Sequence, residues 1–323
     1  MTRTICLSYP LLVLLSPLAG CPSPRHLVTP SPYRDRRVEV WGREGRGPGE
    51  FIKPRAVVCN QRGQVYVADS TGRIQQFTTS GKFVRQWRTP QIEAGKPESM
   101  GLDPNGNLLV PDTHYYRMLV YSEDGKLLRQ WGQRGDQQQP TAAPGNFIFL
   151  NGATATADGR RYITEYGGGF ARVQEFTREG KFIRQFASYG TGPGQFRRPG
   201  GPCIARDGTL LVADTPNHRV HVFALDGKLI RTVGSVGRKL GELSYPYGVA
   251  TDACGNFYVA EWGNHRVQKF DANWKPLAAW GRGGTQPGEL YHPWGVAVDE
   301  TGAVYVADHE NNRVQKIVGW LAG

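Results

Sequence analysis

The sequence predicts an all-β fold, a six-bladed β-propeller of four-stranded antiparallel blades, closed by an N-terminal strand that pairs into the last blade. Three observations support this prediction. The 323 residues include 42 Gly and 22 Pro, and the apolar residues come in short alternating runs rather than long helical stripes. One unit recurs six times along the chain. A lone strand-like stretch near the N-terminus matches the part that the last unit lacks.

Each unit is centred on an acidic residue that ends a strand-like run such as VYVAD (304–308). The spacings between successive acidic residues are 43, 53, 49, 47 and 47. A period in the forties with four short β segments per unit is typical of a propeller blade. The six acidic residues are Asp69, Asp112, Glu165, Asp214, Glu261 and Asp308.

Two further positions recur at a fixed distance from the acidic residue, and we call each of them a column. They indicate how the chain turns within each unit. A glycine lies six residues before every acidic residue, in turns such as DPNG (103–106), where a positive φ is wanted between two strands. A proline lies fifteen residues before five of the six acidic residues, and Leu150 takes that place in the third unit. Proline at the first position of a strand leaves the middle of the hydrogen-bond ladder intact.

The last unit lacks its fourth strand. In units two, four and five that strand ends 19 residues past the acidic residue, and the same count from Asp308 passes residue 323. RVEVWG (37–42) resembles the ends of the fourth strands, and Trp41 precedes Pro54 by the 13 residues that separate Trp280 from Pro293. Pairing of this stretch with residues 313–318 removes the open sheet edges. We therefore expect one propeller over 37–323.

The N-terminal segment differs from the rest of the chain. LLVLLSPLAG (11–20) is an apolar run too short to span a bilayer, and it predicts a signal peptide over residues 1–20. Residues 18–21 (LAGC) match a bacterial lipobox, which predicts cleavage before Cys21 and lipidation of Cys21. An ordinary secretion signal with a chance cysteine is the alternative. Residues 22–36 are Pro-rich and charged, and we expect them to form a tether.

These features predict a protein of the bacterial cell envelope, lipid-anchored on a periplasmic or extracellular face. The formal net charge of +11 favours anionic partners in general, such as phospholipid head groups, acidic polysaccharide or nucleic acid. It does not select among them.

The unit resembles the NHL repeat. The resemblance is strongest at 293–317 (PWGVAVDETGAVYVADHENNRVQKI) and at 246–270, and it weakens in units one to three. Linkers such as GPGEF (47–51) and GPGQF (192–196) strengthen it. The resemblance covers nearly the whole chain after the tether and implies the propeller fold. It leaves function open, because such propellers occur in enzymes, RNA binders and extracellular sensor domains.

An arginine follows every acidic residue after a short turn. The pairs are Asp69/Arg73, Asp112/Arg117, Glu165/Arg172, Asp214/Arg219, Glu261/Arg266 and Asp308/Arg313. Recurrence in every unit favours a repeated structural ion pair. A ring of arginines that binds an anionic ligand is the alternative interpretation.

The residue after the proline column varies from unit to unit and is expected at the mouth of the central channel. The six residues are Arg55, Glu98, Asn151, Gly200, Tyr247 and Trp294. Arg55 and Glu98 are candidates to hold a polar ligand, Tyr247 and Trp294 are candidates for a stacking wall, and Asn151 completes the predicted binding site. An ordinary solvated channel rim is the alternative.

Resemblance to enzyme relatives implies metal sites at this mouth. The lyase that cleaves peptidylamidoglycolate holds zinc there on histidines, but none of the six mouth positions is histidine. Gluconolactonase-type propellers hold a divalent cation on carboxylate and amide oxygens. Glu98 and Asn151 are suited to such an ion, although no third ligand is evident. His218 and His265 occupy equivalent positions in neighbouring units, as a metal or pH-sensing pair or as turn residues.

We therefore expect no cofactor and a monomeric, membrane-anchored, non-catalytic binding module for a protein, peptide or polysaccharide. A metal-assisted lyase or hydrolase with its site in the channel is the second hypothesis. RNA recognition is a third, which export and the paired arginines disfavour. Longer segments around unit three, EYGGGFAR (165–172) and 132–149, are the predicted carriers of specificity, because inserted loops on a rigid scaffold commonly bind ligands.

Overall fold

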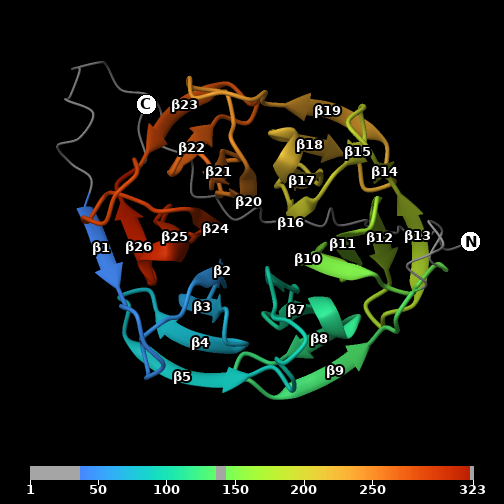
Figure 1. The fold of residues 1–323 in the computed structure, drawn as a ribbon, viewed down its shortest axis with the longest axis horizontal. Helices are drawn as coiled ribbons and strands as arrows, with labels where there is room; N and C mark the ends of the chain where they lie inside the picture. The colour runs from blue at the N-terminus through green and yellow to red at the C-terminus, as the bar shows by residue number, and fades with distance from the viewer. Residues whose placement is uncertain (1–36, 136–142, 321–323) are drawn as a thin grey trace, which may run out of the picture. The chain divides into compact units, whose positions relative to one another are not determined.

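The computed structural model describes residues 37–135 and 143–320. Six four-stranded antiparallel sheets are arranged around a central axis in this part of the chain, which confirms the predicted propeller (Figure 1). The predicted signal peptide, Cys21 and the tether lie outside the described residues. The described residues contain no helix long and apolar enough to cross a membrane.

In blades one to five the strands follow one another from the axis outward in chain order. Blade one has β2 (Pro54–Cys59), β3 (Gln64–Asp69), β4 (Arg73–Thr78) and β5 (Phe83–Arg88). Blade two has β6 (Gly101–Leu102), β7 (Leu108–Asp112), β8 (Arg117–Tyr121) and β9 (Leu127–Trp131). Blade three has β10 (Phe149–Ala155), β11 (Arg161–Gly167), β12 (Phe170–Phe176) and β13 (Phe182–Phe186).

Blade four has β16 (Pro199–Ile204), β17 (Leu210–Asp214), β18 (Arg219–Phe223) and β19 (Leu229–Val233). Blade five has β20 (Pro246–Thr251), β21 (Phe257–Glu261), β22 (Arg266–Phe270) and β23 (Pro276–Trp280). Blade six has β24 (Pro293–Val298), β25 (Val304–Asp308), β26 (Arg313–Val318) and, at its outer edge, β1 (Arg37–Trp41). Short 3₁₀ turns follow β7, β17 and β25 at Thr113–Tyr115, Thr215–Asn217 and His309–Asn311.

The N-terminal strand closes the ring as predicted. Strand β1 pairs antiparallel with β26, with Val38 opposite Ile317 and Trp41 opposite Val314. The Trp41 ring packs 5.5 Å from the Tyr305 ring and 6.1 Å from the Phe77 ring, so it also joins blade six to blade one. The core lies between neighbouring blades. Each of the six blade interfaces in the described residues has its own cluster of buried apolar side chains.

The two faces of the ring are built from different connections. We call the segment that leads from the outer strand of one blade to the inner strand of the next a linker, and residues 42–53 are the first. The linkers and the turns between the second and third strands form one face, which we call the mouth face. All linkers except the second fold back on themselves through short parallel pairings, as in β14 (Ser188–Tyr189) with β15 (Gln195–Phe196).

Acid–arginine pairs fasten these linkers to their blades. The predicted pairs all form, with N–O distances of 2.6, 2.8, 2.5, 3.0, 2.6 and 2.7 Å from blade one to blade six. In blade six, Arg313 also donates to the backbone carbonyls of Thr285, Gln286 and Glu289 in the preceding linker. Asp308 accepts the backbone N–H of Tyr291 from the same linker.

The same arrangement recurs in blades one, three, four and five, whose arginines donate to linker carbonyls and whose acids accept a linker N–H. We call it the linker clamp. It supports the structural interpretation of the arginines in blades one and three to six, because they donate hydrogen bonds inside the scaffold. Blade two is the exception: its linker, residues 89–100, has no parallel pairing, and Asp112 Oδ1 and Arg117 Nη2 are buried without a hydrogen-bond partner among the described residues.

A second contact, the latch, ties each of blades four to six to the linker of the next blade. His218 Nδ1 accepts the backbone N–H of Tyr245, and His265 Nδ1 accepts that of His292, both at 3.1 Å. In blade six, Asn312 Oδ1 accepts the backbone N–H of Lys53 at 2.8 Å. The sequence hypothesis of a pH-sensing pair thus gains a physical basis, since an imidazole can accept at Nδ1 only while that nitrogen is unprotonated.

Burial lowers the pKa of His218 and of His265 below the usual value. For His218 the nearby Asp214 partly opposes this effect. For His265, Arg238 adds to it and Asp308 opposes it. A histidine whose pKa is lower in the folded state than in the unfolded state contributes most stability above the unfolded pKa of about 6.5. That contribution is lost as the pH falls through this value toward the folded pKa.

We therefore predict that the protein loses stability between pH 7 and pH 5, partly through the latches of blades four and five. The double variant His218→Asn/His265→Asn uses the acceptor that blade six already carries, and it should fold and show a smaller drop in Tm over the same pH range. Thermal unfolding followed by circular dichroism at several pH values measures this. Identical pH profiles for the variant and the wild type would show that the latches do not respond to pH.

Candidate functional site

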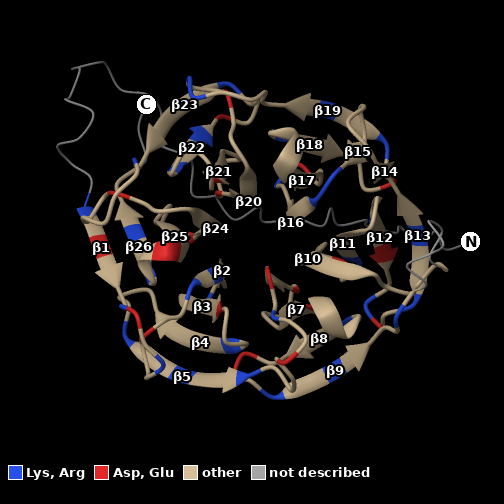
Figure 2. Ribbon diagram, viewed as in Figure 1, with Lys and Arg blue, Asp and Glu red and all other residues tan. Residues whose placement is uncertain are grey.

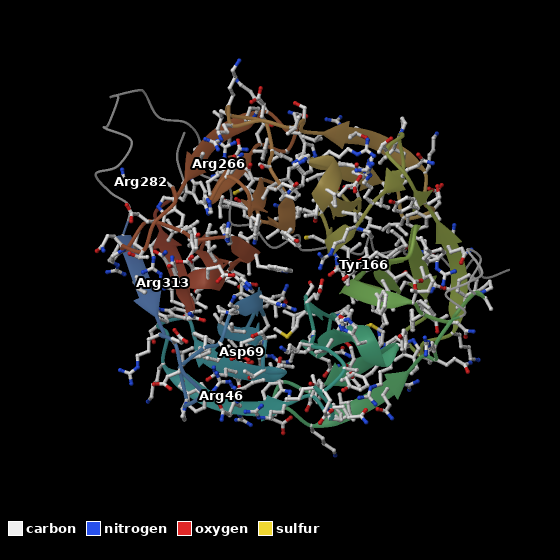
Figure 3. The ribbon with its side chains drawn as sticks, in the orientation of Figure 1. Arg46, Asp69, Tyr166, Arg266, Arg282 and Arg313 are labelled. Carbon is white, nitrogen blue, oxygen red and sulfur yellow. The ribbon has the colours of Figure 1, made fainter. Side chains whose placement is uncertain are left out.

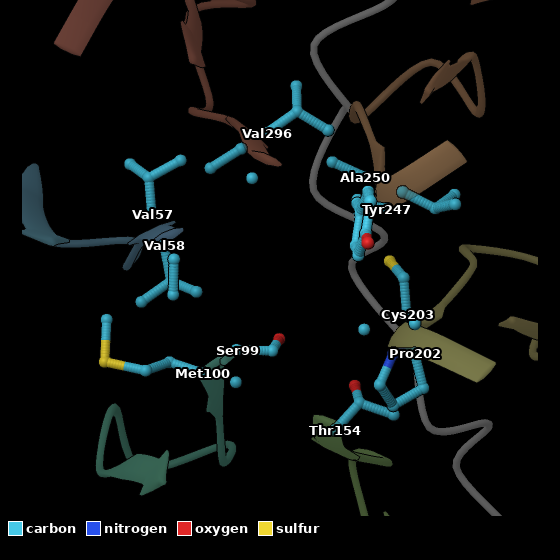
Figure 4. A pocket seen from close by; sticks show the side chains of 18 of the residues that line it. Val57, Val58, Ser99, Met100, Thr154, Pro202, Cys203, Tyr247, Ala250 and Val296 are labelled. Atoms are coloured by element: carbon cyan, nitrogen blue, oxygen red, sulfur yellow. The ribbon is translucent and has the colours of Figure 1, made fainter. Parts of the chain in front are cut away.

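The six predicted mouth residues do surround one opening. They lie at or just before the start of the innermost strands, and these strands line a central cavity of about 250 Å³ (Figure 4). Charged residues are sparse on this wall, because β10, β16, β20 and β24 contain none (Figure 2). The side chains below the mouth are mainly apolar or small, as Val57, Met100, Pro202 and Val296 show. The charge of the cavity is therefore concentrated at its mouth.

Glu98 is the centre of the charged part of the mouth. Its carboxylate is largely buried, with 8% of the side chain exposed, and it accepts a hydrogen bond of 2.6 Å from Arg198. Arg55 approaches the other carboxylate oxygen to 3.9 Å, which is too long for a hydrogen bond. The Tyr166 hydroxyl donates to the same oxygen at 3.5 Å. Two guanidinium groups facing one carboxylate leave a formal surplus of one positive charge.

Aromatic rings hold the two arginines in place. The Arg198 guanidinium lies 4.8 Å from the Tyr166 ring and 5.6 Å from the Tyr247 ring, and the Arg55 guanidinium lies 5.1 Å from the Trp294 ring. The Tyr247 and Trp294 rings stack on each other with centroids 4.0 Å apart. The stacking faces predicted to contact a ligand therefore contact each other and the arginines. Their role is to fix the guanidinium groups by cation–π contact.

Burial changes the ionisation of this cluster. Burial, followed by the charge of Glu98, raises the pKa of Tyr166 to about 12, and burial also raises the pKa of Tyr247. Burial disfavours the charge of Arg198, but Glu98 and the two phenols outweigh it and raise the pKa of this guanidinium. At neutral pH the mouth thus holds neutral phenols and charged arginines.

Asn151 and Gly200 have structural roles at the mouth. Asn151 is buried, and its amide nitrogen donates to the backbone carbonyl of Pro199 in the next blade. A side chain at Gly200 would meet the carbonyl oxygen of Tyr247 at 2.5 Å. Both residues therefore pack blade three or four closely against its neighbour.

The mouth does not fit a divalent cation. Glu98 already faces two guanidinium groups, and their charge opposes a second cation at the same carboxylate. Asn151 is engaged with the neighbouring blade. The described residues contain no cluster of three or more His, Cys, Asp or Glu side chains that could hold a metal ion.

Three mouth residues were not predicted from the sequence. Arg198 precedes the proline column rather than following it. Tyr166 lies on the extension of blade three, which lengthens β11 and β12 to Gly167 and Phe170 instead of forming an irregular loop (Figure 3). His309 donates from Nδ1 to the backbone carbonyl of Pro54, and burial lowers its pKa to about 4, so this imidazole is neutral.

A band of aromatic and histidine rings lies on the mouth face of blades four to six, in the turns after the second strands and in the linkers. His218 lies against Tyr245, Trp262 stacks on His292 at 3.7 Å, and the remaining neighbours lie within 6 Å. Tyr245 and Tyr291 are the most exposed, at 40% and 44%. The band, which we call the aromatic ridge, comprises His218, Tyr245, Trp262, His265, Tyr291 and His292.

Comparisons with known proteins agree with this architecture. Residues 290–317 match the family model for the NHL repeat, and residues 150–287 match that for the SMP-30/gluconolactonase/LRE-like region. A segment of 84 residues is 40% identical to protein lin-41 of Caenorhabditis elegans. This segment covers 24% of the present chain and only 7% of lin-41.

Several solved structures share the fold at low sequence identity. A streptogramin B lyase has a TM-score of 0.61 at 14% identity, over 87% of this chain and 97% of the lyase. A gluconolactonase from Xanthomonas campestris has a TM-score of 0.63 at 14% identity, over 84% and 87%. A chain of a nidogen/laminin complex has a TM-score of 0.55 at 18% identity, over 76% and 84%. The chain is thus a six-bladed β-propeller with an NHL repeat in its last blade, similar in fold to streptogramin B lyase, a gluconolactonase and a chain of a nidogen/laminin complex.

Proposed function

We propose that this propeller is a non-catalytic binding module that holds a protein or peptide partner on its mouth face. The composition of that face carries the proposal. It carries the aromatic ridge, in which Tyr245 and Tyr291 are exposed, and the partly buried arginine–aromatic cluster around Glu98. Tyr, Trp and Arg are the residues that most often supply binding energy at protein interfaces.

The opposite face has a different chemistry. In its turns a side chain accepts the backbone N–H of the residue two positions later, as Asp103 does for Asn105 and Asp252 does for Cys254. Salt bridges such as Arg62–Glu123 also lie there. Turns of this kind use their hydrogen-bonding groups within the turn and offer little apolar area, so the mouth face is the better interface.

Two comparisons favour the catalytic alternative. Residues 150–287 match the gluconolactonase-like family model, and several neighbours in fold are lyases or lactonases. Those structures are too distant in sequence to transfer an activity, and the charges around Glu98 oppose the divalent cation that the family resemblance implies. Stoichiometric metal in the purified protein, with chelator-sensitive lactone hydrolysis, would favour the enzyme.

We further propose that a lipid on Cys21 anchors the module to a bacterial envelope membrane. The lipobox LAGC (18–21) after a short apolar run supports this, and the Pro-rich residues 22–36 would separate the propeller from the lipid surface. A single acyl chain binds membranes only marginally, and stable anchoring takes more than one chain. The lipid is therefore expected to carry several chains.

The anchor is tested by the variant Cys21→Ala, with Cys59→Ala as the matched control. Wild type and the control should sediment with membranes, and Cys21→Ala should move to the soluble fraction, as measured by fractionation and immunoblotting. Retention of Cys21→Ala in the membrane fraction would refute the lipobox assignment.

The binding face is tested by the double variant Tyr245→Ser/Tyr291→Ser. Both rings are exposed, so the fold should persist, and partners captured from envelope extract by the wild type should be depleted at least ~10-fold. The control Val84→Ser/Ile230→Ser removes equally exposed apolar side chains from outer strands β5 and β19. Equal capture by both variants would place the interface elsewhere, and release of the bound material by a polysaccharide-degrading enzyme would assign it to polysaccharide.

A further inference from the structure

We propose that the channel mouth recognises a carboxylate of the peptide partner, and that Arg55 is the residue that binds it. This inference rests on the proposed function and names the chemical group at the centre of the same face. It begins from an imbalance at the mouth. Arg198 forms a hydrogen bond to Glu98, whereas Arg55 does not form one with any described residue.

Arg55 is positioned to receive a ligand. Its guanidinium is held over the Trp294 ring at 5.1 Å, and only 22% of its side chain is exposed. Its Nε is buried and lacks an acceptor. Leaving a charged donor desolvated and unpaired costs free energy, and a ligand oxygen would remove that cost. The planar guanidinium is suited to two parallel hydrogen bonds with a carboxylate.

The charge balance favours a monoanion. The two guanidinium groups and the Glu98 carboxylate sum to a surplus of one positive charge, and one ligand carboxylate neutralises it. Glu98 does not repel this ligand strongly, because Arg198 is hydrogen-bonded to it at 2.6 Å. A doubly charged phosphate would exceed the available charge. The paired arginines of blades one and three to six do not compete for this ligand, because they donate to linker carbonyls in the linker clamp.

The size of the cavity limits what enters it. Its volume of about 250 Å³ lies below the roughly 300–1,000 Å³ of pockets that enclose a whole small ligand. A carboxylate with one adjoining apolar side chain suits the mainly apolar wall at Val57, Met100 and Val296. The rest of the peptide would then lie on the aromatic ridge outside. The carboxylate has two sources, the C-terminus or an acidic side chain.

Four short probes distinguish these sources. They are acetyl-Ala-Val as the free acid and as the amide, acetyl-Glu-Val amide, and acetyl-Gln-Val amide. Ligand-observed NMR with the full propeller measures each Kd. We expect binding of the first probe, the third, or both, and at least ~10-fold weaker binding of the uncharged counterparts, as loss of a charge-assisted hydrogen-bonded pair implies. Equal binding of charged and uncharged probes would overturn the proposal.

Variants test the role of Arg55. Arg55→Gln should weaken binding of the carboxylate probe at least ~10-fold, and Arg55→Lys should weaken it by less, because it keeps the charge but loses the planar fork. Arg85→Gln, on outer strand β5, makes the same charge change and should have no effect. Circular dichroism checks that each variant folds. If Arg55→Gln does not fold, the binding test is made with Arg55→Lys.

Unchanged binding by Arg55→Gln would overturn the proposal, as would tighter binding of galacturonate or inorganic phosphate than of any peptide acid. The two proposals fail separately. If partner capture needs Tyr245 and Tyr291 but not Arg55, the carboxylate site is wrong and the interface stands. If the probes bind at Arg55 but Tyr245→Ser/Tyr291→Ser captures partners as well as the wild type does, the proposed interface is wrong and the carboxylate site stands.

Discussion

The linker clamp is the interaction on which the rest of the structure depends. In blades one and three to six, a buried acid–arginine pair binds the backbone of the incoming linker through both N–H and C=O groups. The short parallel pairings within a linker leave other backbone polar groups that need partners, and the clamp supplies them. It thereby sets where each chain segment turns into its innermost strand, and so where each mouth side chain begins.

The clamp also determines which charges remain for recognition. The sequence shows a strongly basic chain with an arginine in every unit, which by itself suggests a ring for an anionic ligand. Five of those arginines instead donate to linker carbonyls. What is left at the mouth is a small asymmetric cluster: Arg55, Glu98 and Arg198, held by rings from blades three, five and six. A pseudo-symmetric scaffold thus carries a single site.

Periodicity was sufficient to predict the fold and the positions of the mouth residues. The missing fourth strand of blade six and the isolated RVEVWG stretch predicted the β1–β26 pairing, because a repeat fold must supply every blade with the same elements. The same counting placed Arg55, Glu98, Tyr247 and Trp294 around one cavity. These inferences concern backbone position, and a repeat determines backbone position well.

Side-chain contacts between blades were not predictable in this way. Tyr166 reaches Glu98 because the insertion in blade three lengthens a hairpin, and no repeat column reports such a register. Arg198 lies outside the column used to find the mouth, and the stacking of Tyr247 on Trp294 depends on the distance between two blades. Asn312 in the position of His218 and His265 was visible in the sequence. Its meaning required the structure, which shows that all three accept a linker N–H.

The clamp is tested most directly by comparing two arginines in the same protein. Arg266 pairs with Glu261 and also donates to three linker carbonyls, whereas Arg117 has Asp112 as its acceptor and no linker bond among the described residues. Glu261 keeps donors from Ser244, Asn264 and Gln268 when Arg266 is removed, whereas Asp112 has Arg117 as its one donor among the described residues. Each arginine is therefore replaced together with its acid, and Glu261→Gln/Arg266→Met and Asp112→Asn/Arg117→Met are compared by equilibrium unfolding in urea. Glu261→Gln/Arg266→Met should lower the free energy of unfolding by about 2–3 kcal/mol more than Asp112→Asn/Arg117→Met, at about 1 kcal/mol per lost linker hydrogen bond. Equal losses would show that the ion pair alone matters and that the linkers are held by something else.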